Sequence, residues 1–384
     1  MRVVQITTDN REHFKDYANP APHFGAAPEA LLEGFVRRKD VEVHVVSCVR
    51  RPVLSPEKIA PNIWYHALCV PKLGWLTTGY QGCVRAVRRK LGEIRPDIVH
   101  GQGTEKECAF SAVWSGFSNV VTIHGNMAAL GRQFRVPIGS HAWLTARLED
   151  FTLPRTAGVF CNSVYTESLV RPRARRVWRV SNAVRLAFFE APPSVAATSS
   201  RPLLVNVGVI CPWKRQLELV RVAETLSRRG LSFELAFIGR APSGDSYARA
   251  FMEQIRPLEK RGCIRYLGAR STSELIGIFD SAQALVHWPS EESFGLVVAE
   301  ALARNLPVFA SRTGGVADIA TGVPGTELFD AQDLGGLTEA LAGWIKQCCP
   351  RGRGASQVMR QRYHPEVIAA RHLEIYRSVL DAPA

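Results

Sequence analysis

Short apolar runs rich in β-forming residues alternate with longer segments of helical periodicity in the first half of the chain. Residues 27–39 and 80–94 place their apolar side chains at helical spacing, which predicts amphipathic helices. The apolar runs are 2–7 (RVVQIT), 41–48 (VEVHVVSC), 97–101 (DIVHG), 119–125 (NVVTIHG) and 158–163 (GVFCNS). Because the strands of a parallel sheet are buried on both faces, this alternation predicts a parallel sheet covered by helices on both sides.

The alternation begins again after a loop-like segment, residues 187–202 (AFFEAPPSVAATSSRP). The second set of apolar runs is 203–210 (LLVNVGVI), 233–239 (FELAFIG), 264–268 (IRYLG), 284–288 (ALVHW) and 306–311 (LPVFAS). We therefore expect an α/β protein of two doubly wound, Rossmann-like domains, 1–183 and 184–363, with a linker near 184–202. A last helical pattern, at about 364–384, either ends the second domain or packs back on the first.

The predicted sheets suggest where ligands bind. In open parallel sheets, ligands lie outside the carboxyl ends of the strands. Two such domains facing one another would form a cleft with one ligand on each wall. That arrangement suits the transfer of a group between two bound molecules.

Composition agrees with a globular protein. The 384 residues are 46% hydrophobic and 22% charged, and no apolar run approaches the ~18–20 uncharged residues that a membrane-spanning helix needs. The first residues, MRVVQITTDN, lead directly into a strand pattern without the features of a signal peptide, so a cytoplasmic protein is expected. The nine cysteines show no zinc-binding spacing, which favours buried free thiols.

The formal net charge of +13 is distributed unevenly along the chain. Residues 1–183 contain 25 Lys and Arg against 15 Asp and Glu, whereas residues 184–384 contain 23 against 20. A basic half attracts phosphates, whether in an anionic substrate, a membrane surface or a nucleic acid, or it simply keeps the surface soluble. Nucleic acid is disfavoured because the arginines are not interleaved with an aromatic binding platform.

The most informative segment is 291–311, EESFGLVVAEALARNLPVFAS. Gly295 begins a helix, and the free amides of Leu296 and Val297 would form an anion site at its positive end. Glu292 precedes the helix and Glu300 lies in its second turn. Eight residues correspond to about 800° of rotation, so the two carboxylates cannot share one face or hold one metal. They would bind different ends of an extended ligand such as a nucleoside diphosphate sugar, or Glu300 is simply exposed on a surface helix.

This segment resembles the Glu-x7-Glu signature of the retaining GT-B glycosyltransferases, family 4. Glu292 and Glu300 supply the two glutamates, between HWPS and LPVFASRTGGVADI. Further segments resemble the family in the same order, and the likeness is strongest over 203–320. They are 119–126, 158–170, 177–184, 203–219, 236–240 and 264–282. The resemblance implies the GT-B fold and a donor domain similar to that of glycogen synthase.

The family implies that the segment around the two glutamates holds both ends of a donor. Glu292, with the backbone amides of Phe294 and Gly295, would bind hydroxyls of the transferred sugar. Glu300 would bind the ribose, and the first two amides of the helix the phosphates between them. Arg270 lies where the backbone of the family usually meets the base, although a plain surface arginine is equally compatible.

The family also implies a positive charge beside the diphosphate. Lys214, which follows Gly208 at a strand end, would neutralise the diphosphate together with Arg215. The family usually carries an arginine directly after that glycine, whereas this chain has Val209. Arg215 or Arg240 would have to replace it.

In the first domain, the resemblance singles out His124 in TIHG, which would face the transferred sugar and the diphosphate. Gly25 would open a loop toward the donor phosphate and the acceptor, although Ala26 stands where the family has a second glycine. His100 and Gly101, at another expected strand end, either line the acceptor side or form a plain turn.

The implied reaction is sugar transfer from a UDP- or GDP-linked donor to a hydroxyl of a glycan, a lipid-linked acceptor or a small molecule. It would proceed with retention by front-face attack, with His124, Lys214 and Glu292 as catalytic residues and without a cofactor. No metal is expected, since the sequence has no DxD pair of carboxylates.

Two other functions remain open, a nucleotide-sugar-binding protein without catalysis and a nucleotide-sugar epimerase. The basic segments 84–91 and 171–179, with Trp75 and Leu76 nearby, either attach the protein to the anionic cytoplasmic face of a membrane or are exposed helix faces.

Overall fold

The structure, a computed structural model, describes residues 1–192, 201–350 and 352–382. Part of the expected linker near 184–202, residues 193–200, lies outside the described residues, as do the last two positions of the expected C-terminal helix. The chain divides into two compact units. Unit 1 comprises Met1–Arg185 and His364–Ala384, and unit 2 comprises Leu186–Tyr363. The expected boundary at 183/184 is two residues before the one in the structure.

Unit 1 is built on a sheet with the strand order β3-β4-β2-β1-β5-β6-β7-β8. Its pairs are parallel except β3 with β4, which is antiparallel. The strands are β1 (Arg2–Ile6), β2 (Glu42–Val49), β3 (Lys58–Ala60), β4 (Ile63–Cys69), β5 (Ile98–Gln102), β6 (Asn119–Ile123), β7 (Val159–Cys161) and β8 (Val177–Arg179). The expected apolar runs correspond to β1, β2, β5, β6 and β7. The prediction missed β4, where His66 interrupts the apolar run, and the three-residue strands β3 and β8.

Helices cover both faces of the unit 1 sheet. They are α1 (Asn10–Phe14), α2 (Ala26–Val36), α3 (Gln81–Ile94), α4 (Glu107–Val113), α5 (Met127–Gln133), α6 (His141–Thr152), α7 (Val164–Val170) and α16 (Pro365–Leu380). Side chains of α2 and α16 share one hydrophobic core with the strands, and side chains of α3 and α4 share another. The expected doubly wound arrangement is therefore present in unit 1.

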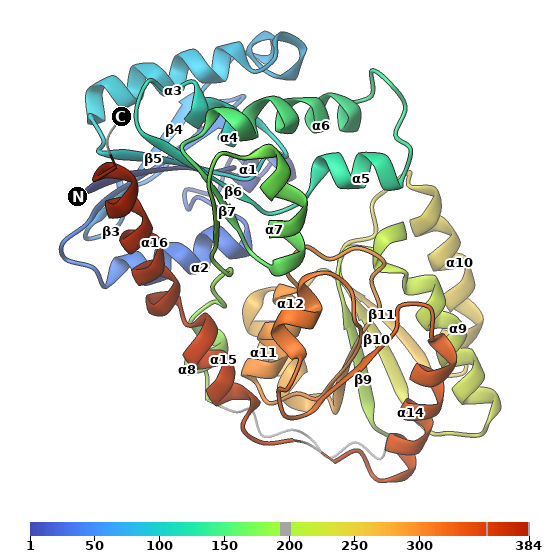
Figure 1. Cartoon of the computed structure of the whole chain (residues 1–384). Helices are drawn as coiled ribbons and strands as arrows, with labels where there is room; N and C mark the ends of the chain where they lie inside the picture. Colours follow the sequence, from blue (N-terminus) through green and yellow to red (C-terminus); the bar gives the residue numbers. More distant parts are fainter. Residues whose placement is uncertain (193–200, 351, 383–384) are drawn as a thin grey trace. The chain divides into compact units, whose positions relative to one another are not determined.

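The C-terminal helix α16 packs against α2 within unit 1, as Figure 1 shows at the red end of the chain. Gly34 of α2 allows this contact. A Cβ atom on Gly34 would lie 2.2 Å from the carbonyl oxygen of Pro365 and 2.7 Å from Cβ of Ala369. The last helix thus belongs to unit 1, although it follows unit 2 in sequence.

Unit 2 contains a second parallel sheet, with the strand order β11-β10-β9-β12-β13-β14. Its strands are β9 (Leu203–Val207), β10 (Glu234–Ile238), β11 (Ile264–Gly268), β12 (Ala284–His287), β13 (Val308–Ser311) and β14 (Thr326–Phe329). Its helices are α8 (Ala187–Glu190), α9 (Gln216–Arg228), α10 (Ser246–Lys260), α11 (Thr272–Ser281), α12 (Leu296–Ala303), α13 (Gly315–Ala320), α14 (Leu334–Lys346) and α15 (Ala355–Tyr363). The two α/β units with parallel sheets confirm the predicted fold class.

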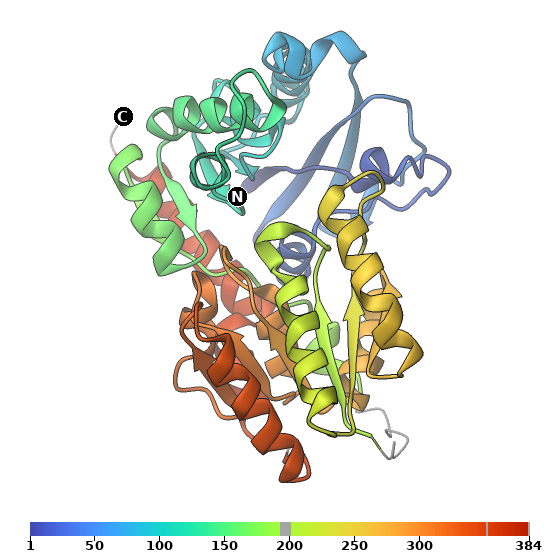
Figure 2. The same ribbon diagram turned by 90° about the vertical axis from the view of Figure 1, so that its right-hand side faces the viewer.

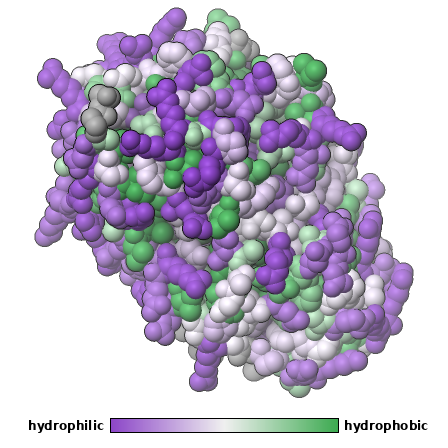
Figure 3. Space-filling view, in the orientation of Figure 1, coloured by the Kyte–Doolittle hydropathy of each residue, from purple (hydrophilic) through white to green (hydrophobic). Residues whose placement is uncertain are grey.

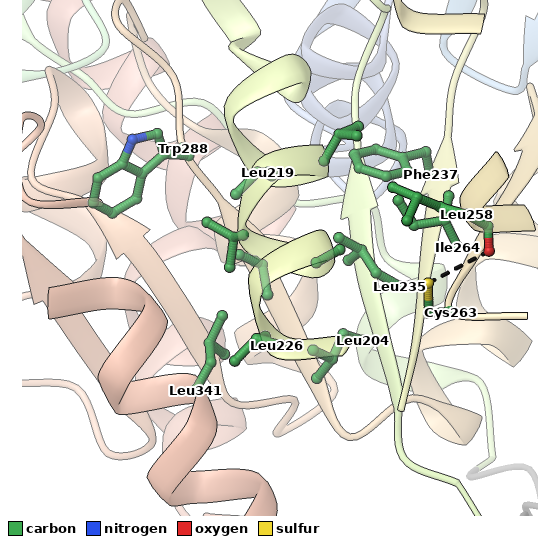
Figure 4. Packing of buried hydrophobic residues seen from close by; sticks show 14 of the residues in the cluster. Leu204, Leu219, Leu226, Leu235, Phe237, Leu258, Cys263, Ile264, Trp288 and Leu341 are labelled. Carbon is green, nitrogen blue, oxygen red and sulfur yellow. Dashed lines mark hydrogen bonds between the residues drawn. The ribbon is translucent and has the colours of Figure 1, made fainter. Parts of the chain in front are cut away.

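Three helices share the main core of unit 2. Figure 2 shows α9, α10 and α14 side by side over the sheet, and residues of all three belong to one buried cluster. In Figure 4, Leu226 of α9 lies between Leu204 of β9 and Leu341 of α14. Leu219 and Leu226 of α9, seven positions apart, are both buried as the helical period requires.

The face of the molecule drawn in Figure 3 is largely polar. In Figure 3, hydrophilic residues cover most of the visible face, with smaller hydrophobic groups among them. Among the residues that the structure describes, no helix combines the length and apolar character needed to cross a membrane.

Candidate donor and histidine sites

The carboxyl ends of three adjacent strands in unit 2 each lead into a glycine. Gly208, Gly239 and Gly268 follow or end β9, β10 and β11. A Cβ atom on Gly239 would lie 2.0 Å from the carbonyl oxygen of Gly208, so only glycine allows these backbones to approach. The three strand ends themselves therefore present backbone atoms at this edge of the sheet.

Lys214 and Glu292 meet at this edge. Lys214 lies in the short 3₁₀ helix η5 (Pro212–Lys214) after β9, and Glu292 lies in the loop between β12 and α12. The ammonium nitrogen Nζ is 2.5 Å from Oε2 of Glu292. Burial opposes ionisation of Glu292, but the positive charge of Lys214 and the hydrogen bonds from His287 and Lys214 together outweigh it and lower the pKa of the carboxyl group to about 2. The glutamate is therefore an ionised acceptor at neutral pH.

His287 orients the same carboxylate, and sequence reasoning did not select it. This residue ends β12 and is 1% exposed, with Nε2 at 3.0 Å from Oε2 of Glu292. Burial lowers the pKa of His287, so the ring is neutral at pH 7 and Nε2–H donates to the carboxylate. The available signal was the histidine at the end of a predicted strand, five positions before Glu292.

The loop before α12 is held by close packing. Gly295 caps the helix with a φ of 101°, in the left-handed region that favours glycine. The N–H of Gly315 donates to the carbonyl oxygen of Glu292 at 2.9 Å, and a Cβ atom on Gly315 would lie 2.6 Å from Cα of Phe294. Phe294 is buried against Tyr363, with ring centroids 5.6 Å apart. The first helical residues, Leu296 and Val297, are half-buried.

Glu300 lies in the middle of α12 and is 5% exposed. The alternative of an exposed glutamate on an ordinary surface helix is therefore wrong. A carboxylate is rarely buried without a polar or charged neighbour, so its position requires a specific environment.

The three arginines considered for the diphosphate or the base lie in different environments. They are Arg215, Arg240 and Arg270. Val209 is 41% exposed, and no charge stands at the position where the family has an arginine. Nη1 of Arg215 donates to the carbonyl oxygen of Ala331 at 2.8 Å, which ties this guanidinium group to the segment before α14. Arg240 is exposed directly after the end of β10. Arg270 contacts its own neighbours, with Nη1 at 3.3 Å from the carbonyl oxygen of Ala269.

In unit 1, His124 follows β6 and is half-buried. Its Nε2 lies 2.9 Å from Oε1 of Gln102, at the end of the neighbouring strand β5. Burial lowers the pKa of His124 to about 4, so the ring is neutral at pH 7. Gly25 caps α2 with extended backbone, and the nearest atom to a Cβ placed on it would be 3.7 Å away. An alanine would therefore fit at Gly25.

Glu105 lies beside His124 and was not singled out by sequence reasoning. Its Oε1 accepts a hydrogen bond from the N–H of Gly125 at 2.7 Å. A Cβ atom on Gly103 would lie 2.2 Å from Oε2 of Glu105 and 3.4 Å from Cδ2 of His124. Burial raises the pKa of Glu105 to about 7. His124 and this carboxyl group thus share the carboxyl end of the unit 1 sheet.

The expectation that His100 and Gly101 line an acceptor surface is wrong. Both lie inside β5 and are buried. Nδ1 of His100 is 2.5 Å from the Tyr376 hydroxyl, and Nε2 is 2.6 Å from Oγ1 of Thr122, so both ring nitrogens are engaged in the core. A Cβ on Gly101 would lie 2.7 Å from Cα of Ala109, which makes this glycine a packing position under α4.

Trp75 is likewise unsuited to the membrane contact considered for it. It is 7% exposed, and its indole N–H donates to the carbonyl oxygen of Val70 at 3.1 Å. Among the described residues, no group of three or more His, Cys, Asp or Glu side chains is arranged to hold a metal ion.

Comparison with known proteins places both halves of the chain in glycosyltransferase families. Residues 188–346 match the model of glycosyl transferases group 1, and residues 29–188 match that of glycosyltransferase family 4. A D-inositol 3-phosphate glycosyltransferase from Corynebacterium urealyticum is 32% identical over 171 residues, which cover 43% of this chain and 40% of the relative. The chain therefore matches less than half the length of that relative.

Two further comparisons extend over more of the chain. A GDP-mannose-dependent alpha-mannosyltransferase from Mycobacterium tuberculosis is 28% identical over 254 residues, covering 61% of this chain and 60% of the relative. The structure of a sucrose-phosphate synthase from Thermosynechococcus elongatus matches with a TM-score of 0.77 and 17% identity, covering 100% of both chains. The two family models show that the chain belongs to family 4 of the glycosyltransferases, and the structural match with the two parallel sheets shows the GT-B fold.

Proposed function

We propose that the protein is a retaining glycosyltransferase that needs no metal ion and moves a sugar from a nucleotide-diphosphate sugar, UDP- or GDP-linked, to a hydroxyl acceptor. The observation that carries this proposal is the arrangement around α12. An ionised Glu292 is paired with Lys214 at 2.5 Å directly before the helix start, and a buried Glu300 lies within the helix.

Each part of this arrangement suits one part of the donor. Glu292 is an acceptor-only group and would bind hydroxyls of the sugar. The positive end of α12 and the ammonium group of Lys214 would stabilise the diphosphate as it accumulates negative charge in the transition state. Glu300 would accept hydrogen bonds from the ribose hydroxyls.

In unit 1, we assign His124 to the transferred sugar. Its ring is neutral at pH 7, because burial lowers its pKa to about 4. A neutral imidazole positions a hydroxyl by hydrogen bonding without adding charge. In a front-face attack the departing diphosphate takes the proton of the acceptor hydroxyl, so no carboxylate has to act as a covalent nucleophile.

The donor is identified by isothermal titration calorimetry of the purified protein with nucleoside diphosphates and their sugars, compared with the corresponding nucleosides. We expect binding that depends on the diphosphate. Transfer to candidate acceptors is then followed by proton NMR of the anomeric centre, with and without EDTA. Inversion of configuration, or loss of activity in EDTA, would contradict the proposed mechanism.

The presence of Val209 is a specific reason to test whether the protein binds nucleotide sugars without catalysing transfer. The arginine expected beside the diphosphate is absent, and Arg215 is tied to Ala331. A protein that only binds nucleotide sugars would show calorimetric binding without transfer, donor hydrolysis or epimerisation. Conversion of a sugar nucleotide to its epimer without an acceptor would instead indicate an epimerase.

Peripheral membrane attachment is a separate proposal. Arg85, Arg88 and Arg89 are exposed on α3, and Leu73 nearby in sequence is 79% exposed. Such a basic surface with an exposed apolar side chain is suited to anionic lipid. Flotation with anionic vesicles at low salt, and release at high salt, would support attachment. Absence of flotation at low salt would contradict it.

A further inference from the structure

A continuous series of buried hydrogen bonds connects the C-terminal helix with His124 inside unit 1. Nε2 of Gln5 donates to the hydroxyl of Tyr376 at 2.9 Å, and Nε2 of Gln102 donates to Oε1 of Gln5 at 2.7 Å. Oε1 of Gln102 then lies 2.9 Å from Nε2 of His124. Tyr376, Gln5 and Gln102 are 0%, 2% and 7% exposed, so water does not compete for these bonds.

The series has a direction, because a carboxamide has one donor end and one acceptor end. Gln5 uses its nitrogen on Tyr376 and its oxygen on Gln102, so Gln102 uses its nitrogen on Gln5. The group of Gln102 that faces His124 is therefore an oxygen, which can only accept. The partner nitrogen of His124, Nε2, must carry the hydrogen.

A second branch at Tyr376 has the same direction. Since its hydroxyl oxygen accepts from Gln5, its hydrogen is available to Nδ1 of His100 at 2.5 Å. The remaining hydrogen of that ring, on Nε2, is then donated to Oγ1 of Thr122 at 2.6 Å. Each bond of the branched series thus joins a donor to an acceptor, as buried polar groups require if they are to stabilise a fold.

We propose that Tyr376, Gln5 and Gln102 are positioning residues that hold His124 with its hydrogen on Nε2 and leave Nδ1 as an acceptor for a substrate hydroxyl. Among the residues that the structure describes, Nδ1 of His124 has no hydrogen-bond partner. The chemical class of its ligand is then a hydroxyl donor, such as a sugar, and not an anionic phosphate oxygen, which would need a donor.

The assignment of a substrate hydroxyl to Nδ1 rests on the proposed function. The assignment of the tautomer does not. The proposal also gives a role to α16, the helix that follows unit 2 in sequence and packs in unit 1. Tyr376 lies 371 positions after Gln5 in sequence, and only the packing of α16 on this unit brings its hydroxyl to the end of the series.

The tautomer is measured directly on the unliganded full chain. Long-range proton–nitrogen NMR of protein labelled with 15N-histidine distinguishes a ring with hydrogen on Nε2 from one with hydrogen on Nδ1. A His124→Gln variant assigns the signal. We expect a single Nε2–H pattern for His124, and an Nδ1–H pattern would overturn the proposal.

Two variants test whether the series controls the ring. Tyr376→Phe removes the hydroxyl that accepts from Nε2 of Gln5, so the amides of Gln5 and Gln102 are no longer held in one orientation from that end, and we expect loss of the single-tautomer pattern of His124. Tyr65→Phe is the matched control, because Tyr65 is 4% exposed and bonded to Asp9 at 2.7 Å in the same unit, outside the series. If His124 gives the same spectrum in Tyr376→Phe as in Tyr65→Phe, the proposal is overturned.

If Tyr376→Phe fails to fold, Gln102→Leu interrupts the series next to His124 and is compared with the same control. A second readout separates this proposal from the proposed function. If nucleoside diphosphates bind but neither Tyr376→Phe nor Gln102→Leu changes the tautomer of His124, the positioning role is wrong and the proposed function stands. If the tautomer responds as expected but no nucleotide sugar binds, the proposed function fails, and with it the assignment of the substrate hydroxyl.

Discussion

The ammonium group of Lys214 lies 2.5 Å from the carboxylate of Glu292, although the two residues are 78 positions apart in sequence. Their pairing connects the loop after β9 with the loop before α12. Each is thereby held in place before any donor binds. Pre-organised charges of this kind stabilise a transition state without reorganisation at the moment of reaction.

Replacing Lys214 by methionine keeps the length of the side chain and removes its charge. Burial of Glu292 would then act without compensation from this charge, so its pKa should rise from about 2. The free energy of unfolding should fall by about 1.5–3 kcal/mol, as for other hydrogen bonds to charged groups. Calorimetry should show at least a roughly tenfold loss of affinity for a nucleoside diphosphate. Lys260→Met, at an exposed position at the end of α10, is the control, and equal affinities in both variants would remove Lys214 from the donor site.

Glu300→Gln tests recognition of the ribose. If Glu300 accepts hydrogen bonds from ribose hydroxyls, the unmodified protein should bind a nucleoside diphosphate more tightly than its 2′,3′-dideoxy form, by roughly tenfold. The variant should lose most of this difference, because an amide can accept at only one of its two positions. Glu253→Gln, exposed on α10, should retain it. A variant that still discriminates as strongly would show that another group reads the ribose.

Gly34→Ala tests the packing of α16. The added Cβ would lie 2.2 Å from the carbonyl oxygen of Pro365, so the helices must separate, and we expect a loss of about 1–3 kcal/mol in the free energy of unfolding. Gly92→Ala is the matched control in α3, where a Cβ would meet no atom within 4 Å. That substitution should stabilise the protein by roughly 0.5–1 kcal/mol, the usual preference of a helix for alanine. Urea unfolding of both variants measures the difference, and a stabilising Gly34→Ala would contradict the close contact between α2 and α16.

Stability should decrease as the pH falls from about 6.5 to 4. Burial lowers the pKa of His66, His124 and His372 to about 4 each, so the unfolded chain binds more protons than the folded one over this interval. Glu105 acts in the opposite sense, because burial raises its pKa to about 7 and its contribution to stability decreases as the pH rises toward 7. The three histidines outnumber it, so the midpoint of urea unfolding should rise with pH.

The slope of this dependence identifies the groups responsible. His372→Phe removes one buried ring that would otherwise have to stay neutral, so the midpoint should change less with pH. His141→Gln, at an exposed position, should leave the slope unchanged. Equal slopes for His372→Phe and the unmodified protein would show that this histidine does not contribute.

Much of the fold follows from local pattern. A strand buried on both faces is continuously apolar, and a helix buried on one face repeats at its own period, so β1, β9, α3 and α9 could be recognised from neighbouring residues alone. The start of α12 was also predictable, since Gly295 and the two glutamates lie within one short segment. The sequence therefore determined the fold class and the donor-side signature without reference to distant residues.

The tertiary structure decided which polar residues are accessible and which are paired. His100 looked like a residue at a strand end, but Tyr376, 276 positions later, covers it in the core. Gln102 carried no signal of its own, and the place of His287 at a strand end did not reveal its partner, because their roles arise only when tertiary packing places His124 and Glu292 beside them. Such contacts join residues far apart in sequence, and local periodicity contains no information about which of them will meet.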